Sequence, residues 1–163
     1  MTGTLPTGTR EPSAKVERAL SEMKIAAPIC AFNNVRIFSR SLERLYDEAF
    51  RPAGLTASQV ALMWTIMSTE PVLLKDLPRF LSCDQTTLSR IVSRAHDLDL
   101  IEIERDPDDQ RLKIVRLSAS GRQRLAGVLP QWKRAQASVE SLIDLSILRK
   151  LAGKARRGLA AQA

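Results

Sequence analysis

The sequence predicts a mainly α-helical domain (α+β) that contains one β-hairpin. Apolar residues between Ile25 and Phe50 recur at three- and four-residue spacings, and two short helical patterns lie close together after residue 56. Residues 100–105 and 111–117 alternate between apolar and polar around "DPDDQ", as hairpin strands do. With 163 residues, 44% of them hydrophobic, the chain is long enough to bury a core as one domain.

The N-terminal third is predicted to hold a tail and a long helix. Residues 1–20 mix Thr, Gly, Pro and charged residues with few apolar ones, so we expect a flexible tail there. The pattern from Ile25 is typical of a long helix with one apolar face, which Pro52 and Gly54 end. "TASQ" at 56–59 then has the form of a capping box, in which Thr56 and Gln59 begin a second helix.

Two further short helices are expected before the hairpin. "KDLPRFL" indicates a brief helix with Pro78 in its first turn. The next helix lies in "SCDQTTLSRIVSRAHDLDL", and either Ser82 with Gln85 or Asp84 with Thr87 supplies its start signal. One face of that helix is apolar, with Leu88, Ile91, Val92, Ala95 and Leu98. The opposite face is polar, with Gln85, Thr86, Ser89, Arg90 and Ser93.

The C-terminal part is predicted to be helical again. Ser118 opens a long helix that breaks near Pro130, and a final helix runs from about Leu145 to Leu159. One subunit cannot cover the apolar faces of the long helices, so we expect residues 21–55 and 118–160 to pair two subunits as a homodimer. Residues 56–117 form the central region between them.

Two short helices followed at once by a hairpin form a helix-turn-helix with a wing. Gln, Thr, Ser and Arg suit a helix that enters the major groove, because they offer donors and acceptors to base edges and phosphates without crowding the backbone. The alternative is an ordinary amphipathic surface helix, but the hairpin directly after it favours binding to double-stranded DNA.

The charge distribution limits how such binding works. The chain carries 25 Lys and Arg against 18 Asp and Glu. Residues 117–163 hold nine basic and two acidic residues. Residues 75–116 hold eight basic and nine acidic residues, so this segment is close to neutral. DNA contact by the wing must therefore depend on a few placed arginines rather than on bulk charge. The acids Asp106 and Asp108, with Pro107, are explained by turn chemistry.

Two stretches resemble the MarR (multiple-antibiotic-resistance regulator) family. "TTLSRIVSRAHDLDLIEIERDPDDQRLKIVRLSASG" resembles its recognition helix, its wing with a D-x-R tip, and the L-T/S-x-x-G that opens the next helix. "RLYDEAFRPAGLTASQVALM" resembles its first helix junction. The resemblance covers about residues 28–142 and indicates one domain of this type over about residues 25–160.

The resemblance implies a winged helix-turn-helix with long N- and C-terminal dimerisation helices. The implied function is a sequence-specific regulator, a repressor or an activator, that binds a palindromic operator as a homodimer and is released by a small anionic aromatic ligand. The alternatives are a cysteine-based regulator that senses oxidative stress and a non-enzymatic winged-helix module for protein interaction.

DNA contacts are implied by the resemblance for Gln85, Thr86, Ser89, Arg90, Arg94, Asp109 and Arg111. The first four lie in or beside the major groove, and Arg94 lies near a phosphate. Arg111 enters the minor groove, with its guanidinium held by Asp109 in a bidentate pair; the alternative is a surface pair that only stabilises the hairpin. Two residues depart from the family pattern: Pro78 replaces an alanine, and Asp99 replaces a glycine, which predicts a strained left-handed residue.

The effector site implied by the family draws on Arg36, Arg40, Tyr46, Trp64 and Met67. Arginines beside aromatic residues and methionine suit an aromatic carboxylate, although each of these side chains can instead serve core or dimer packing. For redox sensing the candidate is Cys30. The peroxide-sensing branch of the family has its cysteine at the position of Phe32, so we interpret Cys30 as a buried inert thiol and Cys83 as structural.

Other function classes are not supported by the sequence. Two cysteines and one histidine, His96, give no zinc spacing, and no Gly-rich phosphate loop or nucleophile–histidine pattern occurs. We therefore predict no enzyme activity, no catalytic residue, no metal and no cofactor. No apolar run approaches the roughly 18 residues of a membrane span, and "MTGTLPTGTREPSAK" has no secretory core. The expected location is the cytoplasm of a bacterial-type cell, with the protein on the nucleoid when DNA-bound.

Overall fold

The computed structural model describes residues 13–158, which fall into two compact units divided between Leu42 and Glu43. The parts of the predicted tail and final helix at residues 1–12 and 159–163 lie outside the described residues.

The first unit contains helix α1 (Ala14–Ala26), the 3-10 turn η1 (Ala27–Ile29) and the first part of α2 (Ala31–Phe50). Residues 14–20 were expected to belong to the flexible tail, and they are helical instead. The physical reason is that Ala, Lys, Glu, Arg and Leu there are strong helix formers, whereas the Thr, Gly and Pro that suggested a tail precede them. The predicted continuous helix from Ile25 is also wrong, because Pro28 interrupts it.

The second unit begins with the end of α2, the turn η2 (Arg51–Ala53) and α3 (Ala57–Thr69). Gly54 ends the turn with a left-handed φ of 66°. The predicted capping box is confirmed: Gln59 N–H donates to Thr56 Oγ1 at 3.3 Å, and Thr56 N–H donates to Gln59 Oε1 at 2.9 Å. Helix α3 therefore starts at the residue that the sequence indicates.

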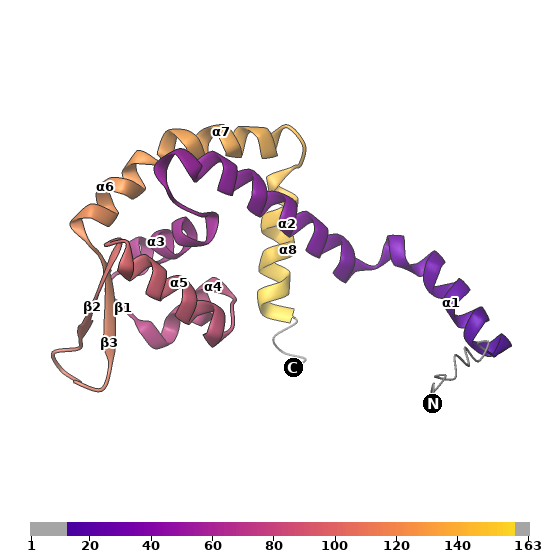
Figure 1. The fold of residues 1–163 in the computed structure, drawn as a ribbon, viewed down its shortest axis with the longest axis horizontal. Coiled ribbons are helices and arrows are strands. Elements are labelled where there is room, and N and C mark those ends of the chain that lie inside the picture. Colours follow the sequence, from indigo (N-terminus) through magenta and orange to yellow (C-terminus); the bar gives the residue numbers. More distant parts are fainter. Residues whose placement is uncertain (1–12, 159–163) are drawn as a thin grey trace, which may run out of the picture. The chain divides into compact units, whose positions relative to one another are not determined.

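The winged part follows, with β1 (Val72–Leu73), η3 (Leu74–Asp76), α4 (Leu77–Leu81) and α5 (Gln85–Asp97). Strands β2 (Ile101–Arg105) and β3 (Lys113–Leu117) form the predicted hairpin, and β1 adds to β3, so the antiparallel order is β1-β3-β2. Figure 1 shows the hairpin extending beyond helices α3 and α5 as a wing.

Three helices complete the unit: α6 (Ala119–Gly127), α7 (Leu129–Glu140) and α8 (Leu145–Gly158). Pro130 lies in the first turn of α7, which confirms the predicted break. None of the helices within residues 13–158 combines the length and the apolar character that a membrane crossing requires.

The core of the second unit lies between α3, α4, α5 and the sheet. Its fully buried side chains include Leu62, Met63, Ile66, Leu77, Leu88, Leu100 and Val115. Helix α5 contributes Leu88, Val92 and Ala95 to this core, so the predicted apolar face is confirmed and the polar face points outward. The predicted mainly α winged-helix fold is therefore confirmed.

Candidate nucleic-acid interface

Helix α5 is anchored on one side and open on the other. Leu88 and Ala95 are fully buried, while the five residues of the opposite face and Arg94 are exposed. The exposed set is Gln85, Thr86, Ser89, Arg90, Ser93 and Arg94. The structure thus brings together on one face every α5 residue that the resemblance assigns to DNA.

The start of α5 is set by Asp84, which settles the alternative with Ser82. Asp84 Oδ1 accepts the Thr87 backbone N–H at 2.9 Å, and Asp84 Oδ2 accepts the Thr87 hydroxyl at 2.7 Å. These bonds, the backbone one foremost, lower the pKa of Asp84. Thr86 and Thr87 are both exposed, but the Thr87 hydroxyl is used in the cap.

The wing loop is shaped by its acidic residues acting on the backbone. Asp106 Oδ1 accepts the N–H groups of Asp108 at 2.9 Å and Asp109 at 3.3 Å, and Gln110 Nε2 donates to Asp106 O at 3.1 Å. The carboxylate of Asp106 therefore holds the turn, as the turn chemistry predicts.

The predicted bidentate pair between Asp109 and Arg111 is wrong. Asp109 Oδ1 accepts the backbone N–H of Arg111 at 2.9 Å, and the ion pairs within residues 13–158 are Arg18–Glu22 and Arg122–Glu70. A carboxylate two residues before an N–H reaches that group more easily than the end of a long side chain. The exposed Arg111 guanidinium has no carboxylate partner among the described residues.

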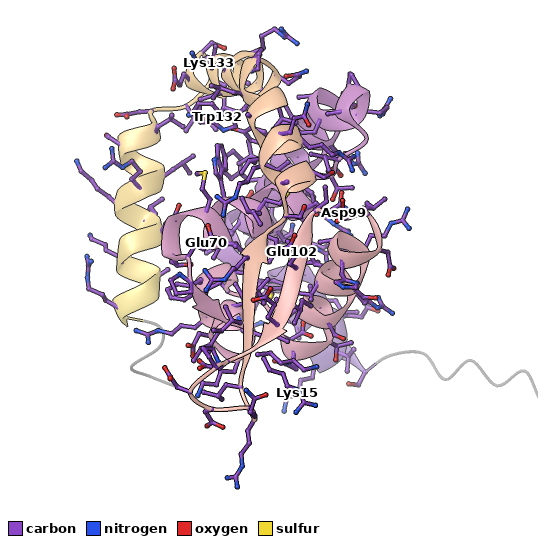
Figure 2. All side chains as sticks on the ribbon, turned by 90° about the vertical axis from the view of Figure 1, so that its left-hand side faces the viewer. Lys15, Glu70, Asp99, Glu102, Trp132 and Lys133 are labelled. Atoms are coloured by element: carbon purple, nitrogen blue, oxygen red, sulfur yellow. The ribbon has the colours of Figure 1, made fainter. Side chains whose placement is uncertain are left out.

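A compact junction links the end of α5 to the start of α6. Asp99 adopts the expected left-handed conformation with φ 53°, and its carbonyl accepts the Ser118 hydroxyl at 2.6 Å. Ser118 Oγ in turn accepts the Gly121 N–H at 2.8 Å. A Cβ on Gly121 would lie 1.9 Å from Leu100 O, so only glycine permits this approach. Figure 2 shows Asp99 beside the lower end of α6.

An apolar cavity of about 280 Å³ lies elsewhere in the second unit. Its lining consists of Tyr46, Phe50, Ala57, Val60, Ala61, Trp64 and Trp132. The rings of Trp64 and Trp132 meet edge to face with centroids 5.3 Å apart. The Tyr46 hydroxyl donates to Gln136 Oε1 at 2.7 Å, and burial, then the Glu140 charge, raises the Tyr46 pKa.

Two of the five residues expected at an effector site, Tyr46 and Trp64, line this cavity. Met67 is exposed and does not line it, and Arg36 and Arg40 are exposed residues of the first unit. Trp132 was missed, because only the fold brings it to Trp64.

Both cysteines are free of disulfide bonds. Cys83 is half-buried, but Cys30 is exposed, so the expectation of a buried thiol is wrong for the single chain. The reason is local: Cys30 follows the Pro28 turn in a unit where no described residue is buried. Within residues 13–158, no three His, Cys, Asp or Glu side chains gather into a metal site.

Comparison with known proteins agrees with this geometry. A family model described as a winged helix DNA-binding domain matches residues 55–121. The HTH-type transcriptional regulator YhbI of Bacillus subtilis is 23% identical over 125 residues, covering 75% of this chain and 81% of its own. The M. tuberculosis transcriptional regulator MosR, solved in complex with DNA, is 27% identical with a TM-score of 0.73 over 82% of this chain and 99% of its own.

A mutant of E. coli MarR, solved with operator DNA, is 20% identical with a TM-score of 0.71 and covers 79% of this chain and 95% of its own. At that identity the likeness concerns the fold. The chain therefore contains a winged helix DNA-binding domain at residues 55–121, and its fold is that of MarR-type winged-helix regulators.

Proposed function

We propose that this protein regulates transcription by placing α5 in the major groove of an operator and its wing in the adjacent minor groove. The observation that carries the proposal is the exposed polar face of α5 beside a hairpin whose Arg111 guanidinium has no carboxylate partner within residues 13–158. A planar cation on a rigid turn suits a narrow, electronegative groove.

In this proposal the α5 residues contact two different parts of the DNA, the base edges and the phosphates. Gln85, Thr86, Ser89 and Arg90 face base edges and give sequence preference. Arg94, farther along the helix, contacts a phosphate and fixes orientation without reading sequence. Asp109 acts by holding the backbone at Arg111 rather than by holding its guanidinium.

The proposal includes a homodimer, supported by apolar side chains that the single chain leaves exposed. In the first unit Ile29 is 81% and Phe32 75% exposed, and in the second unit Leu142 is 78% exposed. Surfaces of this kind mark protein interfaces. A two-fold axis would present two α5 helices to successive major grooves about 34 Å apart, which favours a palindromic operator.

Release by a small molecule is also proposed, with the cavity of Tyr46, Trp64 and Trp132 as its site. Aromatic walls and about 280 Å³ of space suit a small aromatic ligand. No Lys or Arg lines this cavity, so its chemistry favours a neutral ligand over the anionic one expected from the family. Tryptophan fluorescence during titration with paired neutral and carboxylated aromatic compounds would separate the two.

The main test begins with selection of bound fragments from genomic DNA, followed by gel shifts on the recovered operator. Arg90→Ala should weaken operator binding by about 1–3 kcal/mol and relax preference at one base pair. Arg111→Ala should weaken it more than Lys133→Ala, since Lys133 lies on α7 at the end of the unit opposite the hairpin loop (Figure 2). Equal, small losses from both variants would contradict the wing assignment.

Three further measurements separate the alternatives. DNA binding should fall steeply with added salt as counterions are released, whereas a module for protein interaction would give no salt-dependent DNA affinity. Light scattering at micromolar concentration should give a dimer mass, and a monomer there would remove the two-site mechanism. Peroxide treatment should leave operator affinity unchanged; a loss that Cys30→Ser prevents would favour oxidant sensing instead.

A further inference from the structure

A cleft of about 310 Å³ separates the wing from the first residue of α5. It is lined by Leu73, Leu74, Lys75, Gln85, Arg111, Leu112 and Lys113. Three leucines give it apolar walls, and three cations and one amide are its polar side chains. No carboxylate lines it.

This group of cations contrasts with the sequence around it. The surrounding segment, residues 75–116, has nine acidic and eight basic residues. A second hollow, lined by Ser93, His96, Ile103, Glu104, Arg105 and Lys113, includes a carboxylate. Lys113 borders both hollows, but only the first collects positive charge without an acid in its lining. Three cations without an acid among the lining residues favour an anion at this cleft.

The three cations are available to a ligand. Lys75, Arg111 and Lys113 are exposed, and none belongs to an ion pair within residues 13–158. The nearest acid in sequence to Arg111, Asp109, is engaged with the backbone N–H of Arg111. The carboxylate of Asp84 is likewise occupied by Thr87. An anion entering the cleft would meet three free cations.

The position of the cleft identifies the anion. When a helix occupies a major groove and the adjoining wing a minor groove, the sugar-phosphate strand between those grooves must pass between helix and wing. The cleft lies between Gln85, the first residue of α5, and the wing residues 111–113. We infer that it is a phosphate-binding site that clamps this DNA strand, with Lys75 and Lys113 as phosphate ligands.

This inference rests on the proposed function and adds two residues to it. Lys75 comes from η3, thirty-eight positions before Lys113, and pairing of β1 with β3 brings the two segments together through Leu73 and Ile114. Gln85 borders the same cleft and begins the base-reading face, so a phosphate held there lies next to that face and adds affinity for DNA of any sequence.

The test is the salt dependence of affinity for Lys75→Ala, Lys113→Ala and the double variant, measured by fluorescence anisotropy. The probes are the selected operator duplex and an unrelated duplex of equal length, at 50 and 200 mM salt. Each phosphate contact contributes about 0.9 to the slope of log affinity against log salt, or about 3.5-fold in affinity over this range. The wild type loses affinity by a certain factor between 50 and 200 mM salt. Each single variant should lose affinity by a factor about 3.5-fold smaller, and the double variant by a factor about 12-fold smaller.

The preference for operator over unrelated duplex should stay unchanged, because phosphates carry no direct sequence information. Lys113→Arg should keep the wild-type slope, and Lys133→Ala, on α7 away from the hairpin loop, is the matched control (Figure 2). Equal circular dichroism melts establish that each variant folds.

The outcomes separate this inference from the proposed function. A wild-type protein with no salt-dependent DNA binding would overturn both. A steep wild-type slope that survives the double substitution, or a loss confined to the operator duplex, would overturn the clamp alone and leave the proposed function standing.

Discussion

The two units of the chain differ in what holds their apolar side chains. In the second unit Leu62, Leu77 and Leu88 are fully buried in a shared core. In the described part of the first unit no residue is buried, and Phe32 stays 75% exposed on α2. The second unit therefore stabilises its own fold, whereas we infer that the first gains its stabilisation by covering its apolar face with another chain.

The largest effect is expected where the second unit is packed most tightly, at Gly121. Gly121→Ala places a Cβ 1.9 Å from Leu100 O, a backbone atom that cannot move without shifting the link between α5 and β2. We expect a loss of about 3 kcal/mol in the free energy of unfolding, measured by urea denaturation. The matched control is Gly127→Ala at the end of α6, where nothing lies within 4 Å and a gain of about 0.5 kcal/mol is expected. Similar values for the two variants would contradict the packing of this junction.

The next effect belongs to the first unit and should appear in association rather than in folding. Phe32→Ala removes a large exposed apolar side chain, so the dimer dissociation constant should rise by about 30-fold, or about 2 kcal/mol, while the helix content of the chain is kept. Sedimentation across a concentration series measures this change. Ser39→Ala, an exposed polar position of the same helix, is the control. An unchanged dissociation constant for Phe32→Ala would place the interface elsewhere.

A smaller effect distinguishes the helix caps of the two units. Thr56 makes both bonds of a capping box, whereas Ser13, at the start of α1, makes no side-chain cap bond. Thr56→Ala should therefore lower the free energy of unfolding by about 1 kcal/mol, and Ser13→Ala should leave it unchanged. Thr56→Ser keeps a hydroxyl and should recover most of the loss. Equal effects of Thr56→Ala and Ser13→Ala in thermal melts would count against this contrast.

Features that depend on residues close together in the chain could be predicted from sequence. Caps and the hairpin are local, so Thr56, Ser118 and the strands on either side of "DPDDQ" were recognisable within a few residues. For α5 the local pattern allowed two caps, and only the structure selects Asp84. The helix α1 was missed because helix formers after residue 13 were averaged with the Thr, Gly and Pro before them.

The site was less predictable where it depends on contacts between distant residues. The polar face of α5 follows from helical periodicity, but the cleft needs Lys75 beside Lys113, and β1, which joins them, has only two residues. Trp132 reaches Trp64 only through the packing of α7. For Asp109 the residue was recognised but its partner was not, because backbone and guanidinium compete for one carboxylate and sequence does not decide between them.

The smallest expected effect is the pH dependence of the cap on α5. Asp84 has a lowered pKa, chiefly through the Thr87 backbone N–H and then its hydroxyl, so its charged form is favoured in the folded chain. A depressed folded pKa adds stability above the unfolded value, here 3.8, and this stability is lost as the pH falls through the folded pKa. Asp84→Asn keeps a capping oxygen that does not titrate. Thermal melts of both proteins should therefore converge as the pH falls from 5 to below 3.8, since only the wild type loses a charged cap. Melting temperatures that stay parallel over this range would show that the cap of α5 does not depend on the charge of Asp84.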